Sequence, residues 1–124
     1  MLKALPNVRQ VRGEPRRRWY FCHEQDLVVF EDDAGKICGF QLAYDKLGQE
    51  RSLSWQAGRG YASYRVADGE ETALASNTPL LHACAEFDRE RVLQRFLNLA
   101  GELPPHIGDF VTAKLRAYDG SPAP

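Results

Sequence analysis

The most reactive side chains in this chain belong to its cysteines and histidines, and their spacing bears first on metal binding. Two Cys/His pairs occur: Cys22 is next to His23, and His82 lies two residues before Cys84. On a strand, His82 and Cys84 would share a face, whereas Cys22 and His23 would point to opposite faces. A site made of Cys38, His82 and Cys84 would require the fold to bring distant segments together. Because structural zinc sites normally carry two closely spaced ligand pairs, we expect free, mostly buried thiols and no metal.

Ionisable residues beside apolar segments are the candidates for general acid–base catalysis, which needs a carboxylate or an imidazole in an apolar pocket. His23, Glu24 and His82 are these candidates. Acids in turns, Glu31 among them, are expected to be solvated or to cap the backbone. The chain has neither a G-x-S-x-G nucleophile motif nor a glycine-rich nucleotide loop between strand and helix. We therefore expect no cofactor, and the leading interpretation is a domain without enzymatic activity.

Four polar and aromatic residues could line a small-molecule site. Gln41, Tyr44, Glu50 and Trp55 come from two neighbouring expected strands and the turn between them. If they converge on a sheet face that no helix covers, they would form a pocket with an aromatic wall. The alternative is ordinary cross-strand pairing on a solvated sheet, and this interpretation is favoured.

Positive charge is concentrated at the N-terminus. Residues 1–18 carry six basic side chains against Glu14, a balance of +5, and the chain total of −1 leaves −6 for residues 19–124. Arg16, Arg17 and Arg18 run directly into three aromatic residues, which places basic groups beside rings that could stack on RNA bases. We expect instead that this arm neutralises the acidic body of the same chain or of a partner subunit. RNA binding is kept as an alternative.

The central part of the sequence predicts strands. Five segments show strand character, with alternating apolar residues or β-prone composition, at 17–23, 27–31, 37–44, 52–56 and 61–67. Turn sequences containing Asp and Gly separate them, and no helix does, so an antiparallel meander is predicted rather than a parallel sheet. Residues 72–87 are open to two interpretations: a sixth strand, which Pro79 would limit to a start position or a sheet edge, or an extended segment.

Two amphipathic helices are expected after the strands. Asp88 is a suitable N-cap for a helix over 89–100, and Gly101 follows where a helix normally ends. Pro104 and Pro105 break the chain and begin a second helix over 106–118. The predicted fold is α+β: an antiparallel meander of five to six strands with both C-terminal helices packed on one face.

The length and composition predict one globular domain over residues 1–124. Residues 1–15 are expected to form an irregular basic arm and residues 120–124 a frayed tail. No apolar run approaches the ~20 residues of a membrane span, and the first residues lack the apolar core of a signal peptide. These features predict no membrane association and a cytoplasmic location.

Several stretches resemble a family of small uncharacterised bacterial proteins of about this length. The resembling stretches are Arg18-Trp19-Tyr20-Phe21, Asp26-Leu27-Val28-Val29-Phe30, Gly39-Phe40-Gln41-Leu42-Ala43-Tyr44-Asp45-Lys46, Leu53-Ser54-Trp55 and Asp68-Gly69-Glu70. The resemblance covers most of the strand region and implies neither an activity nor a ligand.

Association with another protein chain is a function that requires no catalytic or ligand-binding motif in this sequence. A meander has two faces, and two helices can cover only one of them. Aromatic residues on the other face, with Trp19, Tyr20, Trp55 and Tyr61 as candidates, would form an apolar patch of the kind found at interfaces. We therefore expect self-association, most simply as a homodimer, or binding of a protein partner.

Overall fold

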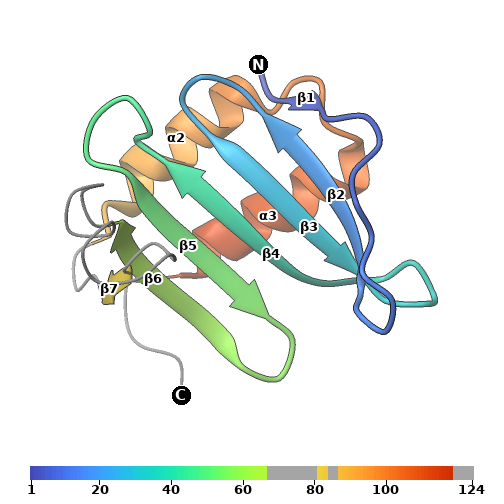
Figure 1. The fold of residues 1–124 in the computed structure, drawn as a ribbon. Helices are drawn as coiled ribbons and strands as arrows, with labels where there is room; N and C mark the ends of the chain where they lie inside the picture. The colour runs from blue at the N-terminus through green and yellow to red at the C-terminus, as the bar shows by residue number, and fades with distance from the viewer. Residues whose placement is uncertain (67–80, 84–86, 119–124) are drawn as a thin grey trace, which may run out of the picture.

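The sheet is a meander in which each strand pairs with the next one in the sequence. The computed structural model describes residues 1–66, 81–83 and 87–118. Among the described residues, seven antiparallel strands form the sheet in chain order: β1 (Lys3–Ala4), β2 (Arg16–Phe21), β3 (Asp26–Glu31), β4 (Ile37–Tyr44), β5 (Arg51–Gln56), β6 (Gly60–Val66) and β7 (Leu81–Ala83). Helices α2 (Arg89–Leu99) and α3 (Pro105–Ala117) lie behind it on one face (Figure 1). The predicted α+β fold is therefore confirmed.

Turn residues hold the hairpins together as their chemistry predicts. The carboxylate Oδ1 of Asp32 accepts hydrogen bonds from the backbone N–H of Ala34 at 3.0 Å and of Lys36 at 2.9 Å. Gly35, in the same β3–β4 turn, has a φ of 82°, which a residue with a side chain adopts only at a cost. The turn therefore fixes which residues of β3 and β4 face each other.

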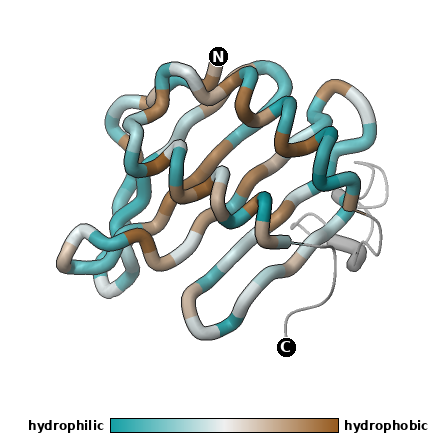
Figure 2. The backbone as a smooth tube through the Cα atoms, turned by 180° about the vertical axis from the view of Figure 1, so that it is seen from behind, coloured by the Kyte–Doolittle hydropathy of each residue, from teal (hydrophilic) through white to brown (hydrophobic). Residues whose placement is uncertain are grey.

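The hydrophobic core lies between the sheet and the helices. Every second residue of the central strands is fully buried on that side, as in Leu27 and Val29 of β3 or Phe40 and Leu42 of β4. The helices contribute a matching apolar stripe, with exposed fractions of 2% or less for Val92, Phe96, Ile107, Val111 and Leu115. Figure 2, seen from the helix side, shows hydrophobic residues recurring along both helices. Burial of this apolar surface is the main force that holds the layers together.

Both helices begin close to the predicted residues. Oδ1 of the N-cap Asp88 accepts a hydrogen bond from the backbone N–H of Arg91 at 3.2 Å, which confirms its predicted role. Helix α3 starts at Pro105, whose missing N–H costs nothing in the first helical turn. Among the described residues, neither helix has the length and apolarity needed to cross a membrane.

The N-terminal arm (residues 1–15) is more ordered than the sequence suggested. Lys3 and Ala4 form strand β1 and pair with Phe21 and Tyr20 of β2. Leu2 is fully buried, and its backbone N–H donates to the carbonyl of Leu99 in α2 at 2.8 Å. The expectation of an irregular arm is therefore wrong for Lys3 and Ala4. A strand this short leaves no periodicity to detect, and only contacts with distant segments stabilise it.

The segment 72–87 is described only in part. Leu81–Ala83 form strand β7, which pairs with β6 at the edge of the sheet, so a further strand is present there. Residues 72–80 and 84–86, and with them the predicted roles of Pro79 and Cys84, lie outside the described residues. The same holds for the tail 120–124.

Candidate functional site

The sheet face that the helices do not cover is the first candidate surface. Residues paired across neighbouring strands share a face, so the register defines three rows on it. The rows are Arg17, Phe30, Gly39, Gln56 and Gly60; Trp19, Val28, Gln41, Ser54 and Ala62; and Phe21, Asp26, Ala43, Ser52 and Tyr64. We call this surface the open face.

Aromatic side chains at one side of the open face are unusually exposed. Trp19 has 37% and Phe21 44% of its surface accessible, whereas Val28 beside them is half-buried. Trp19 and Phe21 are two residues apart on β2, and Val28 lies opposite Trp19 on β3. The three side chains therefore form one apolar patch, and patches of this kind mark interaction sites.

The charges of the open face are neutralised within the chain. The guanidinium of Arg17 lies 2.9 Å from the carboxylate of Glu14, and Nζ of Lys46 lies 2.9 Å from that of Asp26. Arg17 and Asp26 are the charged residues of the three rows, and they belong to opposite outer rows. The centre of the face is therefore apolar or neutral.

A hollow of about 590 Å³ lies at one end of the open face. Phe30 forms part of its lining, and Arg17 and Arg59 also border it. Cys38 reaches it because the pairing of β3 with β4 shifts by one residue there, which leaves Cys38 without a partner opposite it. Strict alternation with Phe40 would put Cys38 in the core; the shift instead leaves it half-buried, with Sγ donating to the carbonyl of Phe30 at 3.5 Å.

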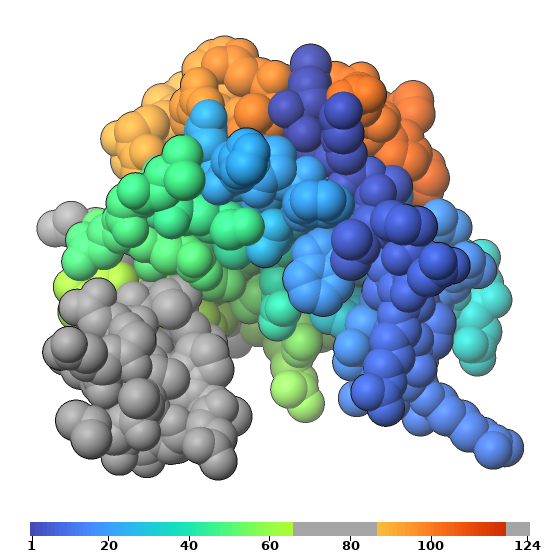
Figure 3. Space-filling view, turned by 45° about the horizontal axis from the view of Figure 1, so that its top comes forward, coloured from blue at the N-terminus to red at the C-terminus, as the bar shows by residue number. Residues whose placement is uncertain are grey.

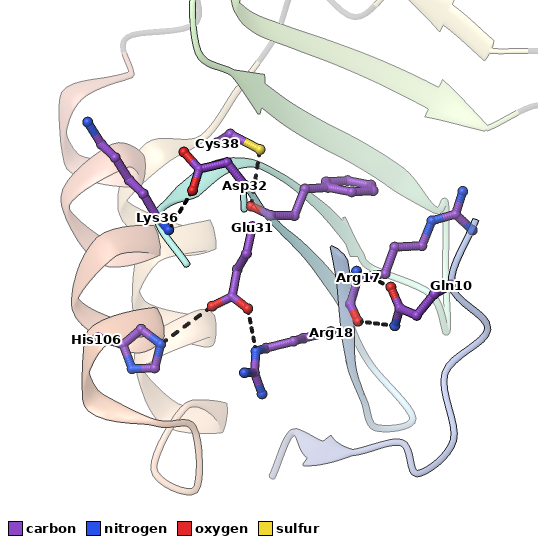
Figure 4. A network of polar contacts seen from close by, with 9 residues as sticks. Gln10, Arg17, Arg18, Glu31, Asp32, Lys36, Cys38 and His106 are labelled. Atoms are coloured by element: carbon purple, nitrogen blue, oxygen red, sulfur yellow. Dashed lines mark hydrogen bonds and ion pairs between the residues drawn. The ribbon is translucent and has the colours of Figure 1, made fainter. Parts of the chain in front are cut away.

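A buried carboxylate, Glu31, lies on the opposite, helix-covered face. It is only 5% exposed, and its Oε1 accepts a hydrogen bond from Nε of Arg18 at 2.7 Å (Figure 4). Nε2 of His106, at the start of α3, lies 3.9 Å from Oε2. The hydrogen bond to Glu31 raises the pKa of Arg18 above its ordinary value. Burial raises the pKa of the neighbouring Tyr20, and the positive charge of Arg18 partly offsets this effect.

Sequence reasoning had placed Glu31 in a solvated turn, and the structure corrects this. Glu31 ends β3 at a position where the alternation that buries Leu27 and Val29 continues, so the signal was present. This geometry favours a structural role for Glu31, whose carboxylate lies between Arg18 of β2 and His106 of α3. Its carboxylate is held by Arg18 and covered by protein, so no reacting group can approach it readily.

The two acid–base candidates whose side chains are described, His23 and Glu24, do not line a pocket together. His23 is exposed in the β2–β3 turn. Glu24 beside it forms an ion pair with Arg95 of α2. The side chain of His82 lies outside the described residues, although its backbone belongs to β7. His23 and Glu24 thus lie at a surface turn, where Glu24 helps to hold helix α2.

The four candidate ligand residues do not converge. Gln41 is exposed on the open face, whereas Tyr44 is buried on the helix side. Trp55 also faces the helices, where Nζ of Lys114 lies 4.0 Å from its ring centre. Glu50 lies half-buried just before β5. The sheet separates these groups, so they form no common pocket.

The three arginines of the candidate RNA site are not equally available. Arg18 pairs with Glu31 and Arg17 with Glu14, while Arg16 is exposed. Within the described part of the chain, no three potential ligand residues lie close enough to hold a metal ion.

Comparison of the chain with known protein families, with curated proteins and with solved structures found no match. The resemblance to a small bacterial family therefore stays a prediction, and the candidate sites have to be judged on geometry alone.

Proposed function

We propose that this chain is a non-catalytic domain that forms a homodimer through its open face. The single observation that carries the proposal is the exposed pair Trp19 and Phe21 on a sheet face that the two helices leave uncovered. Large aromatic side chains are enriched at the centres of protein interfaces, because their burial removes much apolar surface from water.

The charge pattern favours a second copy over a charged partner. Arg17 and Asp26 are already paired inside the chain, so the face offers no net charge for a strongly acidic or basic surface to match. Two copies related by a two-fold axis would bring identical patches together without like-charge repulsion. A neutral, partly aromatic face is well suited to such self-packing.

The size of the face can be compared with that of a standard interface. Five strands at about 4.8 Å spacing and six residues at about 3.4 Å each give a face of roughly 24 by 20 Å. This projection of about 480 Å² is a little over half of the ~800 Å² that each partner buries in an interface of standard size, and the relief of the side chains adds to it.

The proposal is tested by measuring molar mass in solution across protein concentrations, with light scattering after size-exclusion chromatography. We expect a dimer for the unmodified chain and a monomer for the double variant Trp19→Ser/Phe21→Ser. The matched control is Leu47→Ser, which removes a 77% exposed apolar side chain from the β4–β5 turn and should leave the dimer intact. An unmodified chain that stays monomeric at about 100 µM, or a double variant that still dimerises, would refute the proposal.

A small-molecule site is the second candidate, and the hollow beside Phe30 and Arg59 now supports it in place of the four residues predicted from the sequence. Its volume lies within the range of ligand pockets, and Arg59 would favour an anionic ligand. The RNA alternative has less support, since two of its three arginines are paired. We retain a cytoplasmic location as part of the proposal, supported by the free thiols of Cys22 and Cys38.

A further inference from the structure

The outer edge of strand β2 presents a problem that every edge strand shares: backbone groups pointing away from the sheet need hydrogen-bond partners. In β2 these groups belong to alternate residues, including Trp19 and Arg17. The segment at β1 provides some of these partners, because the backbone N–H of Leu5 donates to the carbonyl of Trp19 at 2.8 Å. The paired residues of β1 end at Ala4, well before Arg17 is reached.

A side chain satisfies the backbone of Arg17 instead. Oε1 of Gln10 accepts from the N–H of Arg17 at 2.7 Å, and Nε2 of Gln10 donates to the carbonyl of Arg17 at 2.9 Å (Figure 4). A primary amide thus makes both bonds that a residue of a neighbouring antiparallel strand would make. The same Nε2 also donates to the carbonyl of Val8 at 3.2 Å, which holds the amide in place.

The arm supplies a carboxylate to the same residue. Oε2 of Glu14 lies 2.9 Å from the guanidinium of Arg17. Arg17 therefore receives from the arm both a strand-like amide and an acidic side chain. Any segment that replaced the arm would have to offer these same two groups.

We propose that the outer edge of β2 is a strand-addition site for an extended acidic segment of a partner protein, and that Gln10 and Glu14 occupy it as an internal substitute. Adding a strand to a sheet edge is a common mode of peptide recognition, in which backbone bonds give affinity and side chains give selectivity. Charge decides the partner: Arg16 is exposed beside this edge, and Arg17 loses its carboxylate partner Glu14 when the arm moves away, whereas Arg18 stays paired with Glu31. An acidic segment would compensate the charges of Arg16 and Arg17, whereas a second copy of β2 would bring like charges together.

The arm is built so that its middle part can leave. Its anchor is at the beginning, where Leu2 is buried, whereas residues 9–14 are all exposed. A hollow of about 320 Å³, bordered by Leu5, Val8 and Gln10, separates part of the arm from the strand. In Figure 3 the arm (dark blue) forms a ridge beside the strands, on the outer surface. Little apolar contact is therefore lost when residues 6–14 move away.

The test measures binding of a fluorescein-labelled synthetic heptapeptide of alternating Val and Glu, with blocked ends, to the full chain by fluorescence anisotropy at low salt. The variant Gln10→Ala removes both competing hydrogen bonds, and Gln49→Ala removes an exposed amide from the β4–β5 turn as the matched control. We expect Gln10→Ala to bind the peptide about tenfold more tightly than the unmodified chain, and Gln49→Ala to bind like the unmodified chain. Faster hydrogen exchange at the Arg17 amide of Gln10→Ala would accompany the gain.

Three results would overturn the proposal. The first is equal or absent binding of the acidic peptide by Gln10→Ala and the unmodified chain. The second is equal binding of a control peptide with Lys in place of Glu, which would remove the charge argument. The third is that Gln10→Ala forms larger assemblies in place of peptide complexes, which would mean that the edge accepts another copy of the chain. None of these results depends on whether Trp19→Ser/Phe21→Ser dissociates a dimer, so edge and face are tested separately.

Discussion

The contact between Asp45 and helix α2 allows the contribution of one ion pair to be separated from that of the backbone. Asp45, between β4 and β5, accepts two hydrogen bonds from Arg91, at 2.9 Å to Oδ1 and 2.7 Å to Oδ2. Its φ is 55°, in the left-handed region that Asn and Asp tolerate better than other residues with side chains. Asp45→Asn therefore removes the charge and keeps the backbone preference, whereas Asp45→Ala loses both.

The expected size of the effect follows from exposure. The side chain of Asp45 is 29% and that of Arg91 47% exposed, so solvent screens the pair and the range for surface ion pairs applies. Because Arg91 binds both carboxylate oxygens of Asp45, the contribution of this ion pair should lie at the upper end of that range. We therefore expect Asp45→Asn to lower the free energy of unfolding by about 1 kcal/mol at pH 7. That loss corresponds to a melting temperature lower by about 4 °C. Asp45→Ala should cost about 1 kcal/mol more, from the left-handed backbone.

The effect should depend on pH with a definite sign. Hydrogen bonds from Arg91 lower the pKa of Asp45 in the folded chain, while the unfolded value is about 3.9. The stabilisation is therefore fully present above the unfolded pKa and is lost as the pH falls through the folded pKa. The difference in stability between the unmodified chain and Asp45→Asn should thus narrow below about pH 4.

Urea unfolding followed by circular dichroism at pH 7, 5, 4 and 3 measures this difference directly. Asp33→Asn is the control, because it removes the same charge from an exposed turn position. A gap between the unmodified chain and Asp45→Asn that stays constant down to pH 3 would show that the charge pair is not its cause. If Asp45→Asn lowered the free energy of unfolding at pH 7 no more than Asp33→Asn does, the ion pair would add nothing to stability.

Two other predictions concern the two faces of the sheet. Arg18→Met keeps most of the aliphatic stem but removes the hydrogen bond to the buried carboxylate of Glu31, so the free energy of unfolding should fall by about 1.5–3 kcal/mol in urea titrations; a loss under 0.5 kcal/mol would mean that water or His106 replaces Arg18. Gly39→Ala should lower the melting temperature clearly, because a Cβ there would lie 2.9 Å from the backbone oxygen of Trp55. Gly48→Ala, with open space around it, is the control, and equal melting temperatures for the two variants would contradict the contact.

Much of the sheet was predictable because local patterns record it. Alternation located β4 at its observed bounds, and the cap at Asp88 located the start of α2. The missed strand β1 has two residues, which is too few for any period, and its stability comes from Leu2 and Leu99, far apart in the chain. The irregularity at Cys38 was missed for a related reason: a bulge breaks the alternation between the residues on its two sides, and only the pairing of two strands reveals it.

The candidate sites were less predictable than the fold. Of the aromatic residues predicted for an exposed patch, Trp19 is exposed, whereas Tyr20 is buried and Tyr61 donates a hydrogen bond to helix α3; Phe21, which is exposed, was not among the candidates. Trp55 likewise faces the helices. Which side of a sheet the helices cover depends on packing between segments separated by many residues, and periodicity alone treats the two faces equally.

The sequence by itself determined the α+β class, the meander order, the two helices and the basic N-terminal arm, because alternation, turn residues and helix caps act between neighbours in the chain. Only the tertiary structure decided which aromatic rings meet solvent, that Glu31 is buried against Arg18, and that Gln10 closes the edge of β2. The physical reason is that burial and long-range hydrogen bonds depend on which surfaces come together. That choice belongs to the packing of the whole chain.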